Sequence, residues 1–147
     1  MQWDRPWAAV GPVAGYLLDS NHANRLVDPQ HPVRLRIRAA ILQGDVFYLI
    51  LPVITETVFG FSILPRAVRN RLEWQVVRPS LVLLDLDEVH ATDAADLQVR
   101  LRRGGRQLTI VDALIAAAAL RHDLVVLTTD NDFNHVPQLR VENWLAH

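Results

Sequence analysis

The stretch that decides the fold is Tyr16-Leu17-Leu18-Asp19-Ser20-Asn21, in which a short apolar run passes directly into three helix-capping residues. An uninterrupted apolar run is typical of a strand that is buried on both faces of a parallel sheet. An Asp-Ser-Asn sequence directly after it favours the start of a helix. The stretch therefore predicts a buried strand that leads into a helix, which is the first unit of an α/β fold.

The same alternation of strands and helices continues along the chain. Further strands are expected at 47–50, 81–86 and 124–127, with a short fifth strand at 139–141. Helices are expected at 31–43, 55–64, 65–76, 92–103 and 109–121. This order predicts a three-layer α/β/α sandwich with a mostly parallel central sheet.

The length of 147 residues suits a single domain. Residues 16–147 are expected to form it, and residues 1–15, which include Trp3 and Trp7, are expected to form an N-terminal extension. No apolar run approaches the roughly 20 residues that span a bilayer, and the N-terminus lacks the pattern of a signal peptide. We therefore expect a cytoplasmic protein that makes no membrane contact.

The composition removes several classes of chemistry. The chain has no cysteine, which excludes disulfides, cysteine-bound zinc and thiolate nucleophiles. All 15 basic residues are arginine, so a P-loop lysine or a Schiff-base lysine is also excluded. The net charge of −1 provides no overall positive field, so any contact with nucleic acid requires a local patch.

Acidic residues lie near the ends of predicted strands at distant positions. Asp19 follows the first strand, Glu56 lies a few residues after the second, and Asp112 lies near the start of the alanine-rich helix. Asp130 and Asp132 follow the fourth strand. Because ligands of parallel sheets bind beyond the carboxyl ends of the strands, we expect these side chains to meet at one edge of the sheet.

Each of these acids also has an ordinary structural explanation. Asp19 could cap a helix, Glu56 could be a solvated first-turn residue, Asp112 could pair with Thr109 in a capping box, and 130–132 could be a polar turn. As a group, however, neighbouring carboxylates repel each other unless a cation shares the site. Mg²⁺ and Mn²⁺ prefer such oxygen ligands, and metal ions held in this way suit phosphodiester hydrolysis.

Four segments resemble the pattern of PIN-domain proteins, and most of all the VapC-type toxin ribonucleases of bacterial toxin–antitoxin pairs. They are Tyr-Leu-Leu-Asp19-Ser20-Asn21, Ile-Thr-Glu56-Thr, Asp112-Ala-Leu-Ile-Ala-Ala and Leu-Thr-Thr-Asp130-Asn-Asp132-Phe133. The resemblance extends from about Tyr16 to Trp144. It implies a PIN fold, Mg²⁺- or Mn²⁺-dependent cleavage of an RNA substrate, a cognate antitoxin protein and a homodimer.

The resemblance also implies roles for individual residues. It makes Asp19, Glu56, Asp112 and Asp130 the catalytic, metal-site acids, with Asp132 as a further metal ligand or a residue that orients the loop. Ser20 or Asn21 would hold the Asp19 carboxylate or reach the scissile phosphate. Thr128 or Thr129 would add a contact from its hydroxyl.

Two alternatives remain open. One is a PIN-like scaffold that binds RNA or protein without cleaving. The other is a phosphatase, because Leu81-Val-Leu-Leu-Asp85-Leu-Asp87 resembles the strand and Asp-x-Asp opening of haloacid-dehalogenase-type phosphatases, with Asp85 as the nucleophile. The chain after residue 81 is short for that fold, and a strand followed by a helix cap is the simpler interpretation.

Three further features concern binding. Arginines cluster at 34–38, 66–71 and 100–106, and each cluster is either a contact for the RNA backbone or a solvated helix face. The strongly apolar helix 55–64 is either an antitoxin interface or a well-buried helix. His22, three residues after Asp19, is either an RNA contact or a surface residue.

Overall fold

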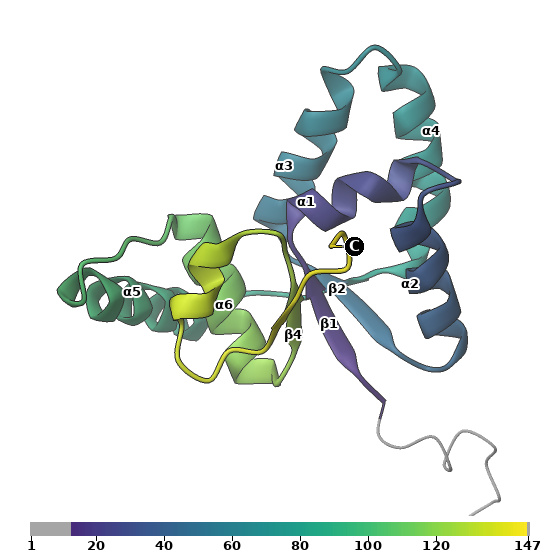
Figure 1. The fold of residues 1–147 in the computed structure, drawn as a ribbon. Helices are drawn as coiled ribbons and strands as arrows, with labels where there is room; N and C mark the ends of the chain where they lie inside the picture. The colour runs from purple at the N-terminus through teal and green to yellow at the C-terminus, as the bar shows by residue number, and fades with distance from the viewer. Residues whose placement is uncertain (1–12, 147) are drawn as a thin grey trace, which may run out of the picture.

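A computed structural model describes residues 13–146 and has a five-stranded sheet at its centre (Figure 1). The strand order is β3-β2-β1-β4-β5, and every neighbouring pair is parallel. The strands are β1 (Gly15–Leu18), β2 (Val46–Leu49), β3 (Val82–Leu83), β4 (Val125–Leu127) and β5 (Val141–Glu142). The expected parallel α/β sheet is confirmed.

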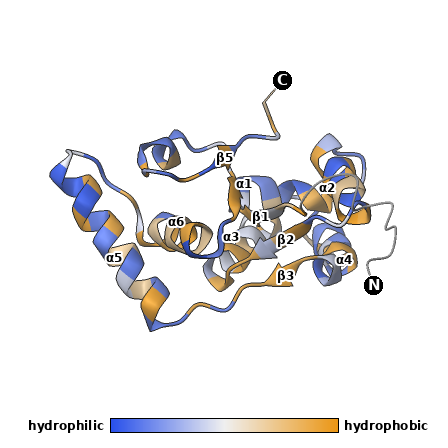
Figure 2. Ribbon diagram, turned by 90° about the horizontal axis from the view of Figure 1, so that it is seen from below, coloured by the Kyte–Doolittle hydropathy of each residue, from blue (hydrophilic) through white to orange (hydrophobic). Residues whose placement is uncertain are grey.

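Helices cover both sides of this sheet. The α-helices are α1 (Ser20–Ala23), α2 (Pro32–Leu42), α3 (Leu51–Ser62), α4 (Ala67–Val77), α5 (Glu88–Arg103) and α6 (Ile110–His122). Three short 3-10 helices are η2 (Asn24–Val27), η3 (Arg78–Ser80) and η4 (Asn131–His135). Helices α5 and α6 lie on one side, with α2 and α4 on the other, which gives the three layers (Figure 2).

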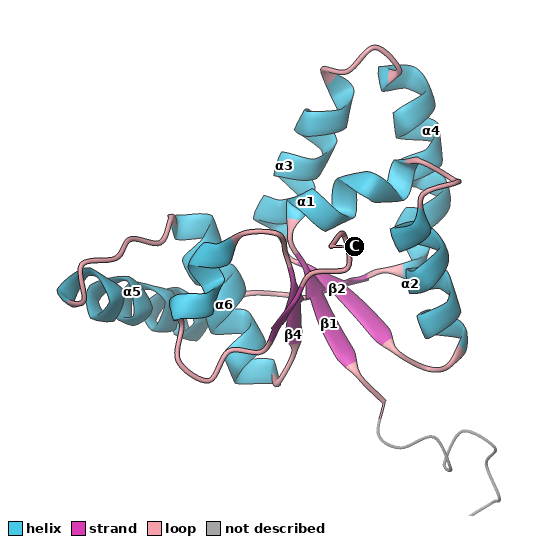
Figure 3. Cartoon of the chain, in the orientation of Figure 1, coloured by secondary structure: helices cyan, strands magenta, loops and turns pink. Residues whose placement is uncertain are grey.

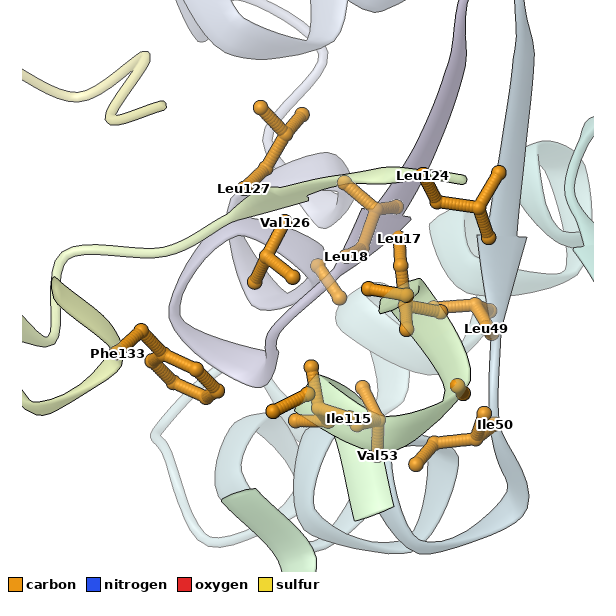
Figure 4. Packing of buried hydrophobic residues seen from close by; sticks show 14 of the residues in the cluster. Leu17, Leu18, Leu49, Ile50, Val53, Ile115, Leu124, Val126, Leu127 and Phe133 are labelled. Atoms are coloured by element: carbon orange, nitrogen blue, oxygen red, sulfur yellow. The ribbon is translucent and has the colours of Figure 1, made fainter. Parts of the chain in front are cut away.

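The core lies where the strands meet α6. Leu17, Leu18 and Leu127 on the central strands are completely buried, as are Ile115 and several alanines of α6. Small alanine side chains let a helix approach a sheet closely, so α6 packs directly on β1 and β4. Figure 4 shows Phe133, from η4, beside the same cluster. The segment that carries the acids at 130 and 132 is thereby anchored in the core.

The register of β1 decides where the candidate site residues lie. Leu18, the last residue of β1, pairs with Leu127, the last residue of β4. The Asp19 N–H donates to the Leu127 carbonyl at 3.0 Å, which continues the ladder by one residue. Asp19 and Thr128 therefore leave the sheet side by side although they are far apart in the sequence.

Helices α3 and α4 form a hairpin that extends beyond the carboxyl edge of the sheet (Figure 3). The predicted helix at 55–64 begins earlier, at Leu51, because Pro52 in its first turn lacks the N–H that a helix start leaves unbonded. Phe59 and Ile63 are 65% and 68% exposed, so this helix is not fully buried. The interpretation as a well-buried helix is wrong for that face.

Boundaries also change around β3. The strand expected at 81–86 covers only Val82–Leu83, which lies at the edge of the sheet. Helix α5 begins at Glu88, before the expected residue 92, because the Asp87 carboxylate accepts hydrogen bonds from the N–H groups of Val89 and His90. Asp87 is therefore a helix cap.

The N-terminal extension lies largely outside the described residues, including Trp3 and Trp7. Strand β1 begins at Gly15, one residue before the expected boundary. A Cβ on Gly15 would lie 2.6 Å from Leu124 Cδ2, so a larger residue there would require the Leu124 side chain to move. Within residues 13–146, none of the helices has the length and apolar character needed to cross a membrane.

Truncation of a β1 leucine tests the central position of this strand. Leu18→Ala is expected to lower the free energy of unfolding by about 2–5 kcal/mol, because it removes buried methyl groups and leaves a cavity. The matched control is Leu42→Ala, because Leu42 is 81% exposed, and it should cost less than about 0.5 kcal/mol. Urea titration monitored by circular dichroism measures both, and equal costs would contradict the packing described here.

Candidate active site

Three of the predicted acids lie at the N-terminal ends of helical elements at the carboxyl edge of the sheet. Asp19 caps α1 and accepts the Ser20 N–H at 2.8 Å, while Asp130 caps η4 and accepts the Asp132 N–H at 2.8 Å. Asp112 lies in the first turn of α6, and its N–H donates to the Thr109 hydroxyl at 3.1 Å. Asp19 therefore caps a helix, as the sequence suggested, and Thr109 caps α6 through the Asp112 N–H.

The electrostatics show that these acids also lie near one another. Burial, together with the negative charges of Asp19, Asp130 and Glu56, raises the pKa of Asp112 to about 6. A hydrogen bond from Thr109 acts on the same pKa in the opposite direction. Burial and the charge of Asp19 also raise the pKa of Glu56. The four predicted acids thus form one mutually repelling group.

Neutral side chains hold the first carboxylate in place. The Thr128 hydroxyl donates to Asp19 Oδ2 at 2.7 Å, and the Asn21 amide donates to the same oxygen at 3.2 Å. Asn21 also donates to the Thr128 hydroxyl at 3.2 Å. Thr129 contributes its main-chain N–H, which donates to Asn21 Oδ1 at 3.2 Å. Asn21 and Thr128 therefore contact Asp19 directly.

Ser20 and Asp132 stand further from this network. Ser20 is half-buried, and its main-chain N–H is the group that bonds to Asp19. Asp132 is exposed, and its N–H bonds to Asp130. These contacts order the loops after β1 and β4, and the Asp132 carboxylate is left facing solvent.

His22 is a buried part of the site and is not a surface residue. It has no exposed surface, and its Nδ1 lies 2.7 Å from Asn21 Oδ1. The Trp144 N–H donates to its Nε2 at 3.0 Å, so Nε2 is unprotonated and Nδ1 donates to Asn21. Burial lowers the pKa of His22 to about 4. With both nitrogens engaged, a direct contact from His22 to RNA is ruled out.

Trp144 joins the end of the chain to the site, a role that the sequence did not indicate. Its ring packs edge-on against Tyr16 and Phe47, with centroid distances of 5.1 and 5.7 Å. The Arg36 guanidinium lies 3.8 Å from the centre of the Trp144 ring. The residues Trp144, His22, Asn21 and Asp19 thus form one continuous chain of contacts.

The donor chemistry of the site suits a hard divalent cation. Carboxylates with raised pKa values lie together, and a shared Mg²⁺ or Mn²⁺ would offset their repulsion. In the part of the chain that the structure describes, no three acidic or histidine side chains already surround one point at coordinating distance. The chemistry of these oxygen donors fits the ion.

A family model described as PIN domain matches residues 16–139. The chain belongs to the PIN domain family. This PIN domain is 37% identical over 123 residues to Ribonuclease VapC51 of Mycobacterium tuberculosis, covering 81% of this chain and 82% of that protein. It is 30% identical over 123 residues to VapC ribonuclease Y4jK of Sinorhizobium fredii, covering 78% of this chain and 86% of that protein.

Solved structures of similar fold agree with this assignment. VapBC2 from Rickettsia felis, bound to a DNA fragment from its promoter, matches with a TM-score of 0.76 and 19% identity, covering 88% of this PIN domain chain and 98% of that one. DNA-bound VapBC from Salmonella typhimurium matches with a TM-score of 0.74 and 22% identity, covering 90% and 99%. At these identities the likeness shows the fold, and the expected PIN fold is confirmed.

Removal of one site charge should stabilise the metal-free protein. Asp112→Asn is expected to raise the free energy of unfolding at pH 7.5 by about 1–2 kcal/mol, after allowance for solvent screening of a half-buried group. The gain should shrink as pH falls from about 6 towards 3.8, because Asp112 then becomes neutral in the folded state. Urea titrations of both proteins in EDTA at several pH values measure this difference in the free energy of unfolding.

The matched control for this charge removal is Asp96→Asn on α5, because Asp96 is exposed and lies outside the site. It should change stability by less than about 0.5 kcal/mol. A loss of stability in Asp112→Asn at pH 7.5 would contradict the mutual repulsion.

The buried His22 makes a second pH prediction. Between pH 6.5 and about 4 the unfolded chain takes up a proton on His22 and the folded protein does not. The neutral His22 therefore makes its full contribution to the free energy of unfolding above pH 6.5. This contribution, about 3 kcal/mol in total, is lost as pH falls from 6.5 to about 4. Because Asp112 has the opposite effect, we compare Asp112→Asn with Asp112→Asn/His22→Gln. The double variant should show the shallower pH dependence, and identical slopes would refute a neutral buried His22.

Proposed function

We propose that this PIN domain protein is a metal-dependent endoribonuclease and the toxin of a toxin–antitoxin pair, acting in the cytoplasm. The observation that carries the proposal is the group of four acids, Asp19, Glu56, Asp112 and Asp130, brought to one edge of the sheet from four parts of the chain. The relatives named as ribonucleases support RNA as the substrate.

In this proposal the chain's residues divide the work of phosphodiester hydrolysis. Asp19, Asp112 and Asp130 would hold Mg²⁺ or Mn²⁺, with Asp132 as a further ligand from the loop. When bound, the metal increases the acidity of water and offsets the charge that develops on the phosphate. Glu56 is exposed and has a raised pKa, which suits its carboxylate to take the proton from the attacking water.

The remaining polar residues orient this group. Asn21 and Thr128 fix Asp19 Oδ2 through two neutral donors, so the carboxylate keeps its full charge for the metal. His22 holds Asn21 through its Oδ1, so that the amide nitrogen faces Asp19. The direction of the Asn21 amide is therefore set by His22 and the Thr129 N–H.

The partner surface proposed for an antitoxin lies on the α3–α4 hairpin. Phe59, Ile63, Val68 and Leu72 are each more than half exposed, so the hairpin presents large apolar side chains to solvent. Exposed apolar groups of this kind suit an amphipathic helix of a partner. The structures of VapBC complexes support an antitoxin partner in general. The homodimer stays a prediction.

The phosphatase alternative has less support. Asp87 is occupied as the cap of α5, and Asp85 is exposed beyond the edge strand β3. Neither residue contributes to the raised pKa values of the acidic group. The non-cleaving scaffold differs from the nuclease only in the outcome of an activity measurement.

Cleavage of a total tRNA pool by the purified protein tests the nuclease. With Mg²⁺ or Mn²⁺ present we expect discrete fragments, which disappear in EDTA. Asp19→Asn and Asp112→Asn should each lower the rate at least about 100-fold, because each removes a metal-holding charge. Gel electrophoresis of labelled RNA measures the rates.

Asp85→Asn serves as the control in this assay, because it removes an acid outside the group and should leave cleavage unchanged. Full activity in Asp19→Asn or Asp112→Asn would overturn the assignment of the site. Loss of activity in Asp85→Asn alone would favour the phosphatase-type nucleophile instead.

A further inference from the structure

A cavity of about 640 Å³, lined by both polar and apolar side chains, lies next to the acidic group. It is bounded by the second half of α5, the loop that leads to α6 and the start of η4. The residues that matter here are Arg102, Arg106, Gln107, Thr109 and Asp132, all of which line it. Its volume is within the roughly 300–1,000 Å³ typical of ligand pockets.

Two residues of the cavity wall touch the candidate catalytic acids directly. The Thr109 hydroxyl accepts the Asp112 N–H at 3.1 Å. The Asp132 N–H donates to the Asp130 carboxylate at 2.8 Å. The cavity therefore adjoins the segments that carry Asp112 and Asp130.

The two arginines of the cavity form no ion pair with an acid of the described chain. The salt bridges within residues 13–146 include neither Arg102 nor Arg106. Arg106 Nη1 lies 2.7 Å from His135 Nε2, and a neutral imidazole can accept this bond without cancelling the charge. The bond holds Arg106 against η4, beside the acidic loop.

Three arginines of the other two clusters have partners away from the acidic group. Arg34 forms a 2.6 Å ion pair with Glu73, and Arg36 stacks on Trp144. Arg71 donates to the Ser62 hydroxyl at 3.1 Å, at the α3–α4 hairpin. A second cavity of about 400 Å³ borders Arg34, but none of the candidate active-site residues lines it. These three arginines therefore have other contacts, whereas Arg102 and Arg106 line the cavity beside Asp132.

A polyanionic substrate faces a physical problem at this site. The acidic group repels phosphates, so the strand needs fixed positive charge close to the scissile bond. Arginine binds phosphate oxygens in a bidentate manner and also stacks on bases. Among the surfaces considered, the cavity with Arg102 and Arg106 is the one that meets this need beside the acids.

We propose that this cavity binds the nucleotide next to the scissile phosphate of a single-stranded RNA, with Arg102 and Arg106 on its backbone phosphates. A concave site receives a base that is free of its partner strand, whereas a duplex presents its phosphates on a convex surface. The exposed Gln107 amide offers hydrogen bonds to the edge of that base. The inference rests on the proposed nuclease function and specifies how its substrate is held.

Binding of RNA to a non-cleaving protein tests this inference. The probe is a fluorescein-labelled, mixed-sequence single-stranded RNA of ten nucleotides, and the protein is the Asp112→Asn variant. Adding Arg102→Ala and Arg106→Ala should weaken binding at least about tenfold, because charge-assisted contacts are lost. The slope of log K against log salt should fall by about 1.4, since each single-strand phosphate contact contributes about 0.7.

The matched control is Arg100→Ala with Arg103→Ala in the same background. These arginines lie on the same helix, are exposed and do not line the cavity. The control pair should change affinity less than about twofold, and thermal unfolding by circular dichroism should show that both double variants are folded. The slope of log K against log salt distinguishes a lost phosphate contact from a change in the shape of the cavity, because only a lost phosphate contact lowers the slope.

Any of the following results would contradict the proposal that this cavity binds RNA. If both pairs of substitutions weakened RNA binding equally, the attraction would be a diffuse effect of positive charge. If neither pair weakened RNA binding, Arg102 and Arg106 would not contact the RNA. Equal or tighter binding of duplex RNA would exclude a single-strand site, and so would a complete lack of RNA binding. The nuclease proposal fails separately, if wild-type protein with metal leaves RNA intact while the cavity variants still lose affinity.

Discussion

The parallel pairing of β1 with β4 is the constraint on which the rest of the site depends. It places the ends of two strands that are distant in sequence next to each other, and the Asp19 N–H bonds to the Leu127 carbonyl across them. Helix α6 packs against the same two strands, so its first turn, with Asp112, returns to the same edge. A slip of one residue would reverse the faces of the side chains and separate Asp19 from Thr128.

A second constraint acts on the direction of one carboxylate. Asp19 is held by Asn21, Asn21 by His22, and His22 by the main chain of Trp144. A neutral imidazole suits this position because it accepts a bond on one nitrogen and donates on the other. The C-terminal segment that follows β5 is thus part of the site's support, although it contributes no acid.

The sequence predicted what depends on neighbours in the chain and failed where distant contacts decide. Strands β1, β2 and β4 were predicted because each apolar run is buried on both faces, as a parallel sheet requires. The run at 81–86 looked similar, but β3 lies at the sheet edge and its Val82 is 45% exposed. Asp19, Glu56 and Asp130 were proposed because each lies near a strand end, and Asp112 because it begins the alanine-rich helix. The burial of His22, in contrast, depends on Trp144 at the other end of the chain.

The hydrogen bonds of the acidic group explain how a repelling cluster can persist. Asp19 is bonded to a main-chain N–H, an amide and a hydroxyl, and all three donors are neutral. The salt bridges of residues 13–146 use other acids, on the outer helices and near β4. Neutral donors fix the positions of the carboxylates without cancelling their charge, so the repulsion lowers the stability of the free protein. A cation that binds only the folded state would recover this free energy, and stability would then depend on its concentration.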